Sequence, residues 1–210
     1  SYNGTDIFAN PIIDQVGLEL TKHFAREATK RSELEGLTGI TQGSTTLTSD
    51  SLPQVLKEEY STNYLHFNWG QYYSRNAYMK ETLEFEDLYF YDNMKEFSIS
   101  SEDLLNCFTL DSKIIQHFVD NPNSYSCFPT DEKFFTHFMT ITTHGFFETS
   151  SLLNQNYALL DAVTNSPICG ETLSLYNNLN PELKQTMRNY FARVIDTEYS
   201  LAYIVNYLYE

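Results

Sequence analysis

The chain has 210 residues, with 13 Lys and Arg against 28 Asp and Glu, and a formal net charge of −15. This shortage of basic residues excludes a nucleic-acid-binding surface, because phosphate recognition along a polynucleotide needs clustered Lys and Arg. With 41% hydrophobic residues, 15 Phe and 16 Tyr, the chain has enough apolar material for a core. We therefore expect a single domain over residues 1–210.

The first half of the chain has helical periodicity interrupted by one polar stretch. A helix is expected over residues 11–36, because Asn10 is a good N-cap and apolar residues follow it at spacings of three or four. The Gly-, Ser- and Thr-rich stretch 38–50 predicts a flexible loop. Two further helical segments are expected over 51–80 and 82–97.

Helix-start signals recur in the second half of the chain. They open expected helices at Ser101, Asp111, Asp131 and Ser150. The last helix is the clearest, since Asn180 and Pro181 begin it and apolar residues carry it to the C-terminus. No stretch alternates apolar and polar residues at period two. The sequence therefore predicts an all-α fold, an irregular bundle of about six to nine helices with a long C-terminal helix.

Histidines and glutamates on two of these helices form a candidate metal site. Glu19 and His23 are spaced to share one helix face, and His137, His144 and Glu148 share another if residues 131–148 are helical. Two such helices facing each other would bind iron, manganese or zinc inside a bundle. The preferred interpretation assigns no cofactor, with a solvated stripe on the first helix and hydrogen-bonded histidines on the second.

Aromatic residues are concentrated between positions 60 and 97, which contain 12 of them. They either form a tyrosine-rich core or line a contact surface. The residues predicted to contact a partner are Tyr64, Trp69, Tyr72, Tyr73, Glu86 and Asp87.

Other signals are weak. The three cysteines, Cys107, Cys127 and Cys169, are too far apart for a zinc motif and are expected to be buried thiols, with one disulfide as the alternative in an exported protein. The start of the chain lacks the features of a signal peptide and lacks Met, which leaves open a cytoplasmic location or secretion after removal of a signal. No apolar run is long enough for a transmembrane helix.

No phosphate-binding loop, H-E-x-x-H or Gly-x-Ser-x-Gly motif identifies a chemistry. From the charge and the aromatic segment we predict an acidic helical domain that binds another, basic protein, as immunity proteins, inhibitors or effectors do. The alternative is a helical-bundle enzyme or carrier with an aromatic-lined pocket and the His/Glu site described above.

Overall fold

The structure is a computed structural model that describes residues 29–40, 50–92, 94, 109–165 and 176–209. Parts of three predictions lie outside these ranges: the expected helix at Ser101, the larger part of the expected first helix, and residues 41–49 of the 38–50 loop. The α-helices are α2 (Thr29–Thr38), α3 (Leu52–Leu56), α4 (Arg75–Ala77), α5 (Asp111–Asp120), α6 (Asn154–Thr164) and α8 (Pro181–Tyr209). Single turns are η1 (Tyr72–Ser74), η2 (Tyr78–Thr82), η4 (Pro122–Ser124) and η5 (Ser151–Leu153).

The described residues contain a parallel sheet, so the prediction of an all-α fold is wrong. Its strands are β1 (Ser61–His66), β2 (Asp87–Phe90) and β3 (Phe134–Met139), in the order β2-β1-β3. Both neighbours run parallel to β1. Parallel strands joined through helices make this an α/β fold.

The missed strands have a physical explanation. Five of the six β1 residues are buried, because helices cover both faces of the sheet. Such a strand has no solvent-exposed face, so its apolar and polar residues need not alternate as they do in a half-exposed strand. In β3, the spacing of Phe134, Phe135 and Phe138 also matches one face of a helix, and this match misled the prediction after Asp131.

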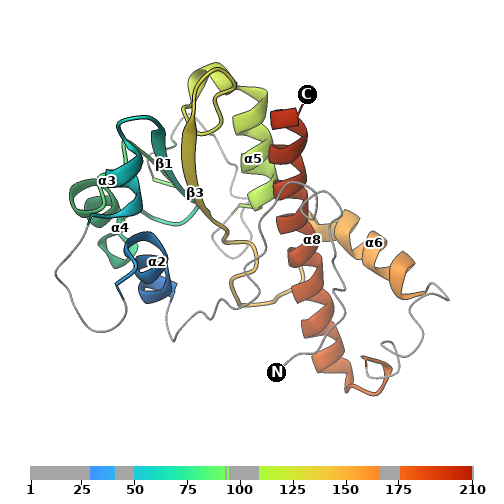
Figure 1. Cartoon of the computed structure of the whole chain (residues 1–210). Coiled ribbons are helices and arrows are strands. Elements are labelled where there is room, and N and C mark those ends of the chain that lie inside the picture. The colour runs from blue at the N-terminus through green and yellow to red at the C-terminus, as the bar shows by residue number, and fades with distance from the viewer. Residues whose placement is uncertain (1–28, 41–49, 93, 95–108, 166–175, 210) are drawn as a thin grey trace.

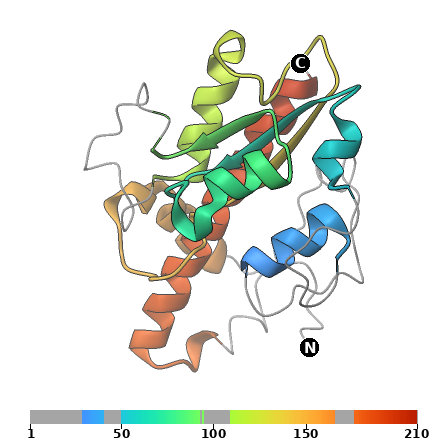
Figure 2. The same ribbon diagram turned by 90° about the vertical axis from the view of Figure 1, so that its left-hand side faces the viewer.

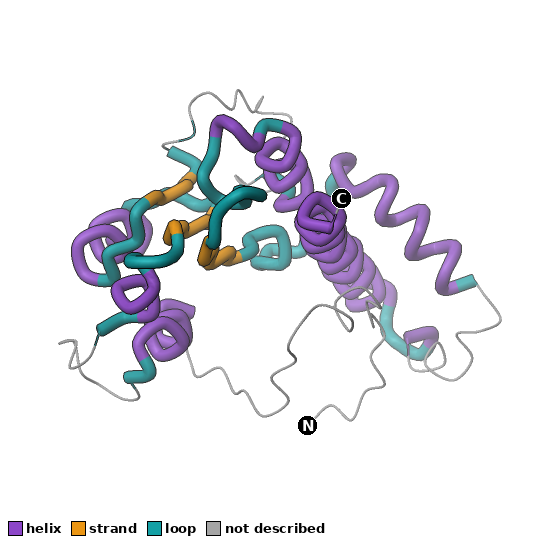
Figure 3. Tube along the Cα trace, turned by 45° about the horizontal axis from the view of Figure 1, so that its top comes forward, coloured by secondary structure: helices purple, strands orange, loops and turns teal. Residues whose placement is uncertain are grey.

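Two apolar layers sandwich the sheet. On one face, Leu65 and Phe67 pack with Ile114, Ile115 and Phe118 of α5, and the C-terminal half of α8 lies against the same cluster. On the other face the buried cluster is Leu37, Tyr64, Met79, Leu83, Phe85 and Phe90. Figure 1 shows α5 and α8 on one side of the sheet and α2, α3 and α4 on the other, and Figure 3 shows the strands between these two groups.

Three of the helix-start signals in the described residues are followed by helices, whereas the signal at Asp131 is followed by β3. The signal at Asp111 opens α5, that at Ser150 precedes η5 and α6, and that at Asn180 precedes the 29-residue α8. Helix α8 packs along both α5 and α6 (Figure 1). None of the helices in the described ranges combines the length and hydropathy needed to cross a bilayer.

Candidate active site

The carboxyl ends of the three strands meet at one edge of the sheet. His66, the last residue of β1, is in register with Phe90 and Met139, which end β2 and β3. The ring Nδ1 of His66 donates a hydrogen bond to the Met139 carbonyl at 3.1 Å. Burial lowers the pKa of His66 to about 4, so the ring is neutral at pH 7. Open parallel sheets bind their ligands at this edge.

A buried carboxylate on α2 joins the helix to the sheet. Glu33 Oε1 accepts a hydrogen bond from Tyr64 Oη at 2.6 Å, and Oε2 accepts one from Arg75 Nε at 3.1 Å. His137 Nε2 lies 3.7 Å from Oε1, and its ring stacks on Tyr64 at a centroid distance of 5.6 Å. Glu33 therefore connects α2, β1, β3 and α4 beside the carboxyl edge.

The charge states in this cluster follow from burial and from the partners. Burial alone raises the pKa of Glu33, but its contacts with His137, Tyr64 and the Arg75 guanidinium outweigh burial and lower it. Burial and the neighbouring Glu33 charge raise the pKa of Tyr64. At neutral pH the cluster thus holds an ionised carboxylate, a protonated phenol and a guanidinium that is almost fully buried.

The turn before Arg75 has a strained backbone. Tyr73 and Ser74 both have left-handed φ angles, 58° and 55°, which residues other than glycine rarely adopt. The Tyr73 ring is half-exposed and lies 5.2 Å from the Arg75 guanidinium carbon. Consecutive strained residues persist where surrounding contacts hold them, and they cluster at functional sites. Figure 2 looks onto this face, with the helical segment 75–82 in front of the sheet.

The start of α2 lies against this turn. Lys30 Nζ donates a hydrogen bond to the Tyr73 carbonyl at 3.3 Å and lies 5.8 Å from the centre of the Tyr78 ring. Thr29 precedes Glu33 by four positions, so both side chains lie on one face of α2. The exposed Thr29 hydroxyl is therefore one helical turn from the buried Glu33–Arg75 pair.

The predicted metal-site residues are not brought together. Glu19 and His23 lie outside the described residues. His137 is on β3 whereas His144 and Glu148 are exposed in the segment beyond it, so the premise of one shared helix face is wrong. In the described part of the chain, no three His, Cys, Asp or Glu residues are arranged to hold a metal ion. His137, His144 and Glu148, the three that the structure describes, therefore do not form an iron, manganese or zinc site.

The predicted contact residues divide between core and surface. Tyr64 is fully buried, while Trp69, Tyr72 and Tyr73 are about half-exposed. Glu86 and Asp87 are exposed, but each binds within the fold: Glu86 accepts from the backbone N–H of Thr62, and Asp87 accepts from Ser126. Much of the 60–97 aromatic segment thus forms the core beneath the site.

Sequence reasoning missed Glu33, His66 and Arg75. One signal was available for His66, because an imidazole that ends a buried parallel strand lies at the ligand-binding edge. No comparable signal exists for Glu33 and Arg75, which are 42 residues apart and meet only in the folded chain.

Comparison with solved structures supports the α/β assignment. The crystal structure of the lipoteichoic acid synthase LtaP from Listeria monocytogenes matches 88% of this chain with a TM-score of 0.56 and 16% sequence identity. This chain spans 41% of the length of that protein, and the likeness shows a shared fold. A search of curated proteins gives no match.

A family model for sulfatases matches residues 1–210, the whole chain. Enzymes of this family usually bind a metal ion. The match places the chain in a family of enzymes, which overturns the prediction of an acidic domain that binds a basic protein partner. The chain belongs to the sulfatase family.

Proposed function

We propose that the carboxyl edge of the sheet is part of a site that cleaves or transfers a sulfate or phosphate ester, and that Thr29 supplies its nucleophile. The observation that carries the proposal is the buried Glu33–Arg75 pair, which holds the face of α2 bearing Thr29 against this edge. The family of the chain supports the reaction class.

The local chemistry supports an anionic substrate. Sulfate and phosphate esters are tetrahedral anions, and the exposed ammonium of Lys30 lies against the strained turn at Tyr73. The buried Arg75 guanidinium is already paired with Glu33, so it holds the turn and α2 in place. The Thr29 hydroxyl is next to Lys30 on α2, where it can attack an ester bound by this cation. The described residues offer no ligand set for a metal, so no step is assigned to one.

The proposed reaction has two displacements. The Thr29 oxygen attacks sulfur or phosphorus, a new O–S or O–P bond forms, and the ester bond to the alcohol breaks. The Thr29 proton passes to a base and the departing alkoxide gains a proton, which leaves the group covalently bound to Thr29. Attack by water then releases sulfate or phosphate, and attack by an acceptor alcohol transfers the group instead; either restores the hydroxyl.

The test uses Thr29→Ala and Thr29→Ser with p-nitrophenyl sulfate, p-nitrophenyl phosphate and bis(p-nitrophenyl) phosphate as substrates. The alanine variant should lose at least about 10³-fold in kcat, and the serine variant should retain most of it. Thr38→Ala, at the other end of α2, is the matched control and should leave kcat unchanged. An alanine variant with wild-type kcat would refute Thr29 as nucleophile, and the preferred ester distinguishes sulfuryl from phosphoryl transfer.

A further inference from the structure

The segment that follows β3 is anchored at its first end by two buried aspartates. The backbone N–H groups of Ile141 and Thr142 donate to the Asp111 carboxylate at 2.8–3.1 Å. Thr142 Oγ1 donates in turn to Asp196 Oδ2 at 3.0 Å. Asp196 also accepts from the backbone N–H and the hydroxyl of Ser112. The start of the segment is thus fixed to both α5 and α8.

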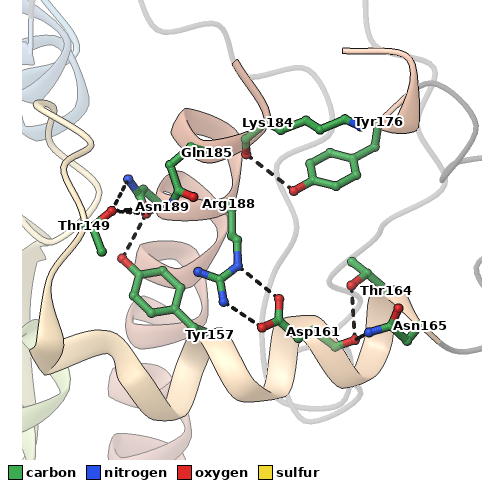
Figure 4. A network of polar contacts seen from close by, with 10 residues as sticks. All are labelled: Thr149, Tyr157, Asp161, Thr164, Asn165, Tyr176, Lys184, Gln185, Arg188 and Asn189. Atoms are coloured by element: carbon green, nitrogen blue, oxygen red, sulfur yellow. Dashed lines mark hydrogen bonds and ion pairs between the residues drawn. The ribbon is translucent and has the colours of Figure 1, made fainter. Parts of the chain in front are cut away.

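Side chains of α8 anchor the second end. Arg193 Nη2 donates to the backbone carbonyls of Glu148 at 2.9 Å and Phe146 at 3.4 Å. Between them, the Phe147 carbonyl accepts from Asn189 Nδ2 at 2.8 Å. Three successive carbonyls are therefore bound by side chains of one helix. Figure 4 shows the surroundings of Asn189, whose Oδ1 accepts from Tyr157 Oη at 3.0 Å.

Between the two anchors lie only Thr143, His144 and Gly145. The backbone N–H of His144 donates to the Ile141 carbonyl at 2.8 Å, which closes a tight turn. The His144 ring is exposed, and its Nδ1 donates to the Gly145 carbonyl at 2.7 Å, so this nitrogen carries the proton. The anchored segment thus presents an imidazole of defined tautomer shortly after the carboxyl end of β3.

The chemistry of Arg193 indicates a role in conformation. Its side chain is completely buried, and burial lowers its pKa. Neutral carbonyls offset the desolvation of a guanidinium less well than a carboxylate does. An apolar side chain of similar volume would fill the space without this cost, whereas several directed N–H donors select one backbone path.

We propose that Asn189, Arg193 and Asp196, which lie on one face of α8 at positions i, i+4 and i+7, are positioning residues that hold His144 at the site. This inference rests on the proposed function, since it assigns His144 to the reaction at the same edge. The three residues act through the backbone of 141–149 and do not touch the substrate.

The decisive comparison makes one chemical change at two places on α8 in the intact protein. Arg193→Lys replaces the forked guanidinium donors by a single ammonium, and Arg188→Lys makes the same change in the exposed pair with Asp161 of α6 (Figure 4). On the preferred p-nitrophenyl ester, Arg193→Lys should lower kcat about 10- to 100-fold with little change in KM. Arg188→Lys should leave both constants unchanged.

A double-mutant cycle separates positioning from general damage to the fold. If Arg193 acts through His144, Arg193→Lys should lower kcat no further in a His144→Ala background. Equal losses in both backgrounds, or equal kcat for the Arg193→Lys and Arg188→Lys proteins, would overturn the inference. Where Arg193→Lys fails to fold, Asp196→Asn tests the first anchor in the same way.

The ring resonances of His144, followed by NMR in histidine-labelled protein, give a readout independent of turnover. They should shift or broaden in the Arg193→Lys protein and stay unchanged in the Arg188→Lys protein. An inactive wild-type protein with this pattern would reject the proposed function and keep the anchoring. Unchanged His144 resonances in the Arg193→Lys protein would reject the anchoring whether or not the wild type is active.

Discussion

The Glu33–Arg75 pair allows a quantitative test of what holds the site together. Both side chains are almost completely buried, and the Glu33 carboxylate also accepts a 2.6 Å hydrogen bond from Tyr64. Glu33→Gln removes the charge while keeping a carbonyl oxygen for Tyr64. The Arg75 guanidinium then remains buried beside Met139 Sδ and the Tyr73 ring, without its carboxylate. Removing one partner of a buried ion pair costs about 3–5 kcal/mol, and we expect about 3 here because the Tyr64 hydrogen bond survives.

Arg75→Met creates the complementary defect. It removes the guanidinium and leaves the buried Glu33 carboxylate with only Tyr64 and His137 of the partners described above, which should lower the free energy of unfolding by about 2–4 kcal/mol. The double variant contains no uncompensated charge, so its loss should be about 2 kcal/mol smaller than the sum of the two single losses. Free energies of unfolding from urea titrations at pH 7.5 measure all three values.

The matched control is Glu59→Gln, which removes a carboxylate from the exposed pair with Lys133. Exposed pairs contribute little, so its free energy of unfolding should equal that of the wild type within error. The described role of the Glu33–Arg75 pair is refuted if Glu33→Gln lowers the free energy of unfolding no more than this control does. It is also refuted if the loss in the double variant equals the sum of the two single losses.

Three further predictions concern residues around the site. Burial and the nearby Asp196 charge raise the pKa of Asp111 from 3.8 to about 7, so the folded state binds this proton more tightly than the unfolded state. As the pH rises from 5 to 7, the free energy of unfolding of the wild type should therefore fall by about 1 kcal/mol per pH unit. Asp111→Asn should remove this slope in urea titrations. Gly70→Ala should destabilise the fold by about 1–3 kcal/mol, because the new Cβ would lie 2.9 Å from the Phe90 ring. The control is Gly36→Ala on α2, whose Cβ meets no atom within 4 Å and should not destabilise the fold. Thermal melts of both variants test this. Iodoacetamide at pH 8 should alkylate Cys127 only after unfolding, because burial raises the pKa of its thiol. Peptide mass spectrometry of native and denatured protein measures the labelling. Rapid labelling of the native protein would contradict the packing around Cys127.

Short sequence signals correctly predicted the helix starts that neighbouring residues determine. Helices α5 and α8 begin where acidic and capping residues precede an apolar repeat, and such signals act within one or two helical turns. Strand β1 has no such signal, because a strand covered on both faces is selected by the helices packed on it. Its identity depends on contacts with residues tens of positions away, which periodicity does not encode.

The candidate site was harder to predict for the same reason. The sequence around Glu33 shows only helical periodicity, and no carboxylate near Arg75 in the sequence marks it as half of an ion pair. The parallel register brings them together, since β1 carries Tyr64 beneath both and β3 carries His137 alongside. The contacts of Glu33 and Arg75 could be predicted only together with the sheet, and the expectation of an all-α fold excluded the sheet.

The acidic composition is compatible with an anionic substrate. A polynucleotide needs many cations along its length, and 13 Lys and Arg spread over 210 residues cannot provide them. One sulfate or phosphate ester needs only a few charge-assisted hydrogen bonds, and the exposed Lys30 lies against Tyr73 at the proposed site. The long-range repulsion from the net charge of −15 is screened over about 10 Å at 0.1 M salt, whereas these short contacts are much less affected. Binding of an anion at the proposed site would therefore depend on nearby cations such as Lys30, which the net charge of the chain does not reveal.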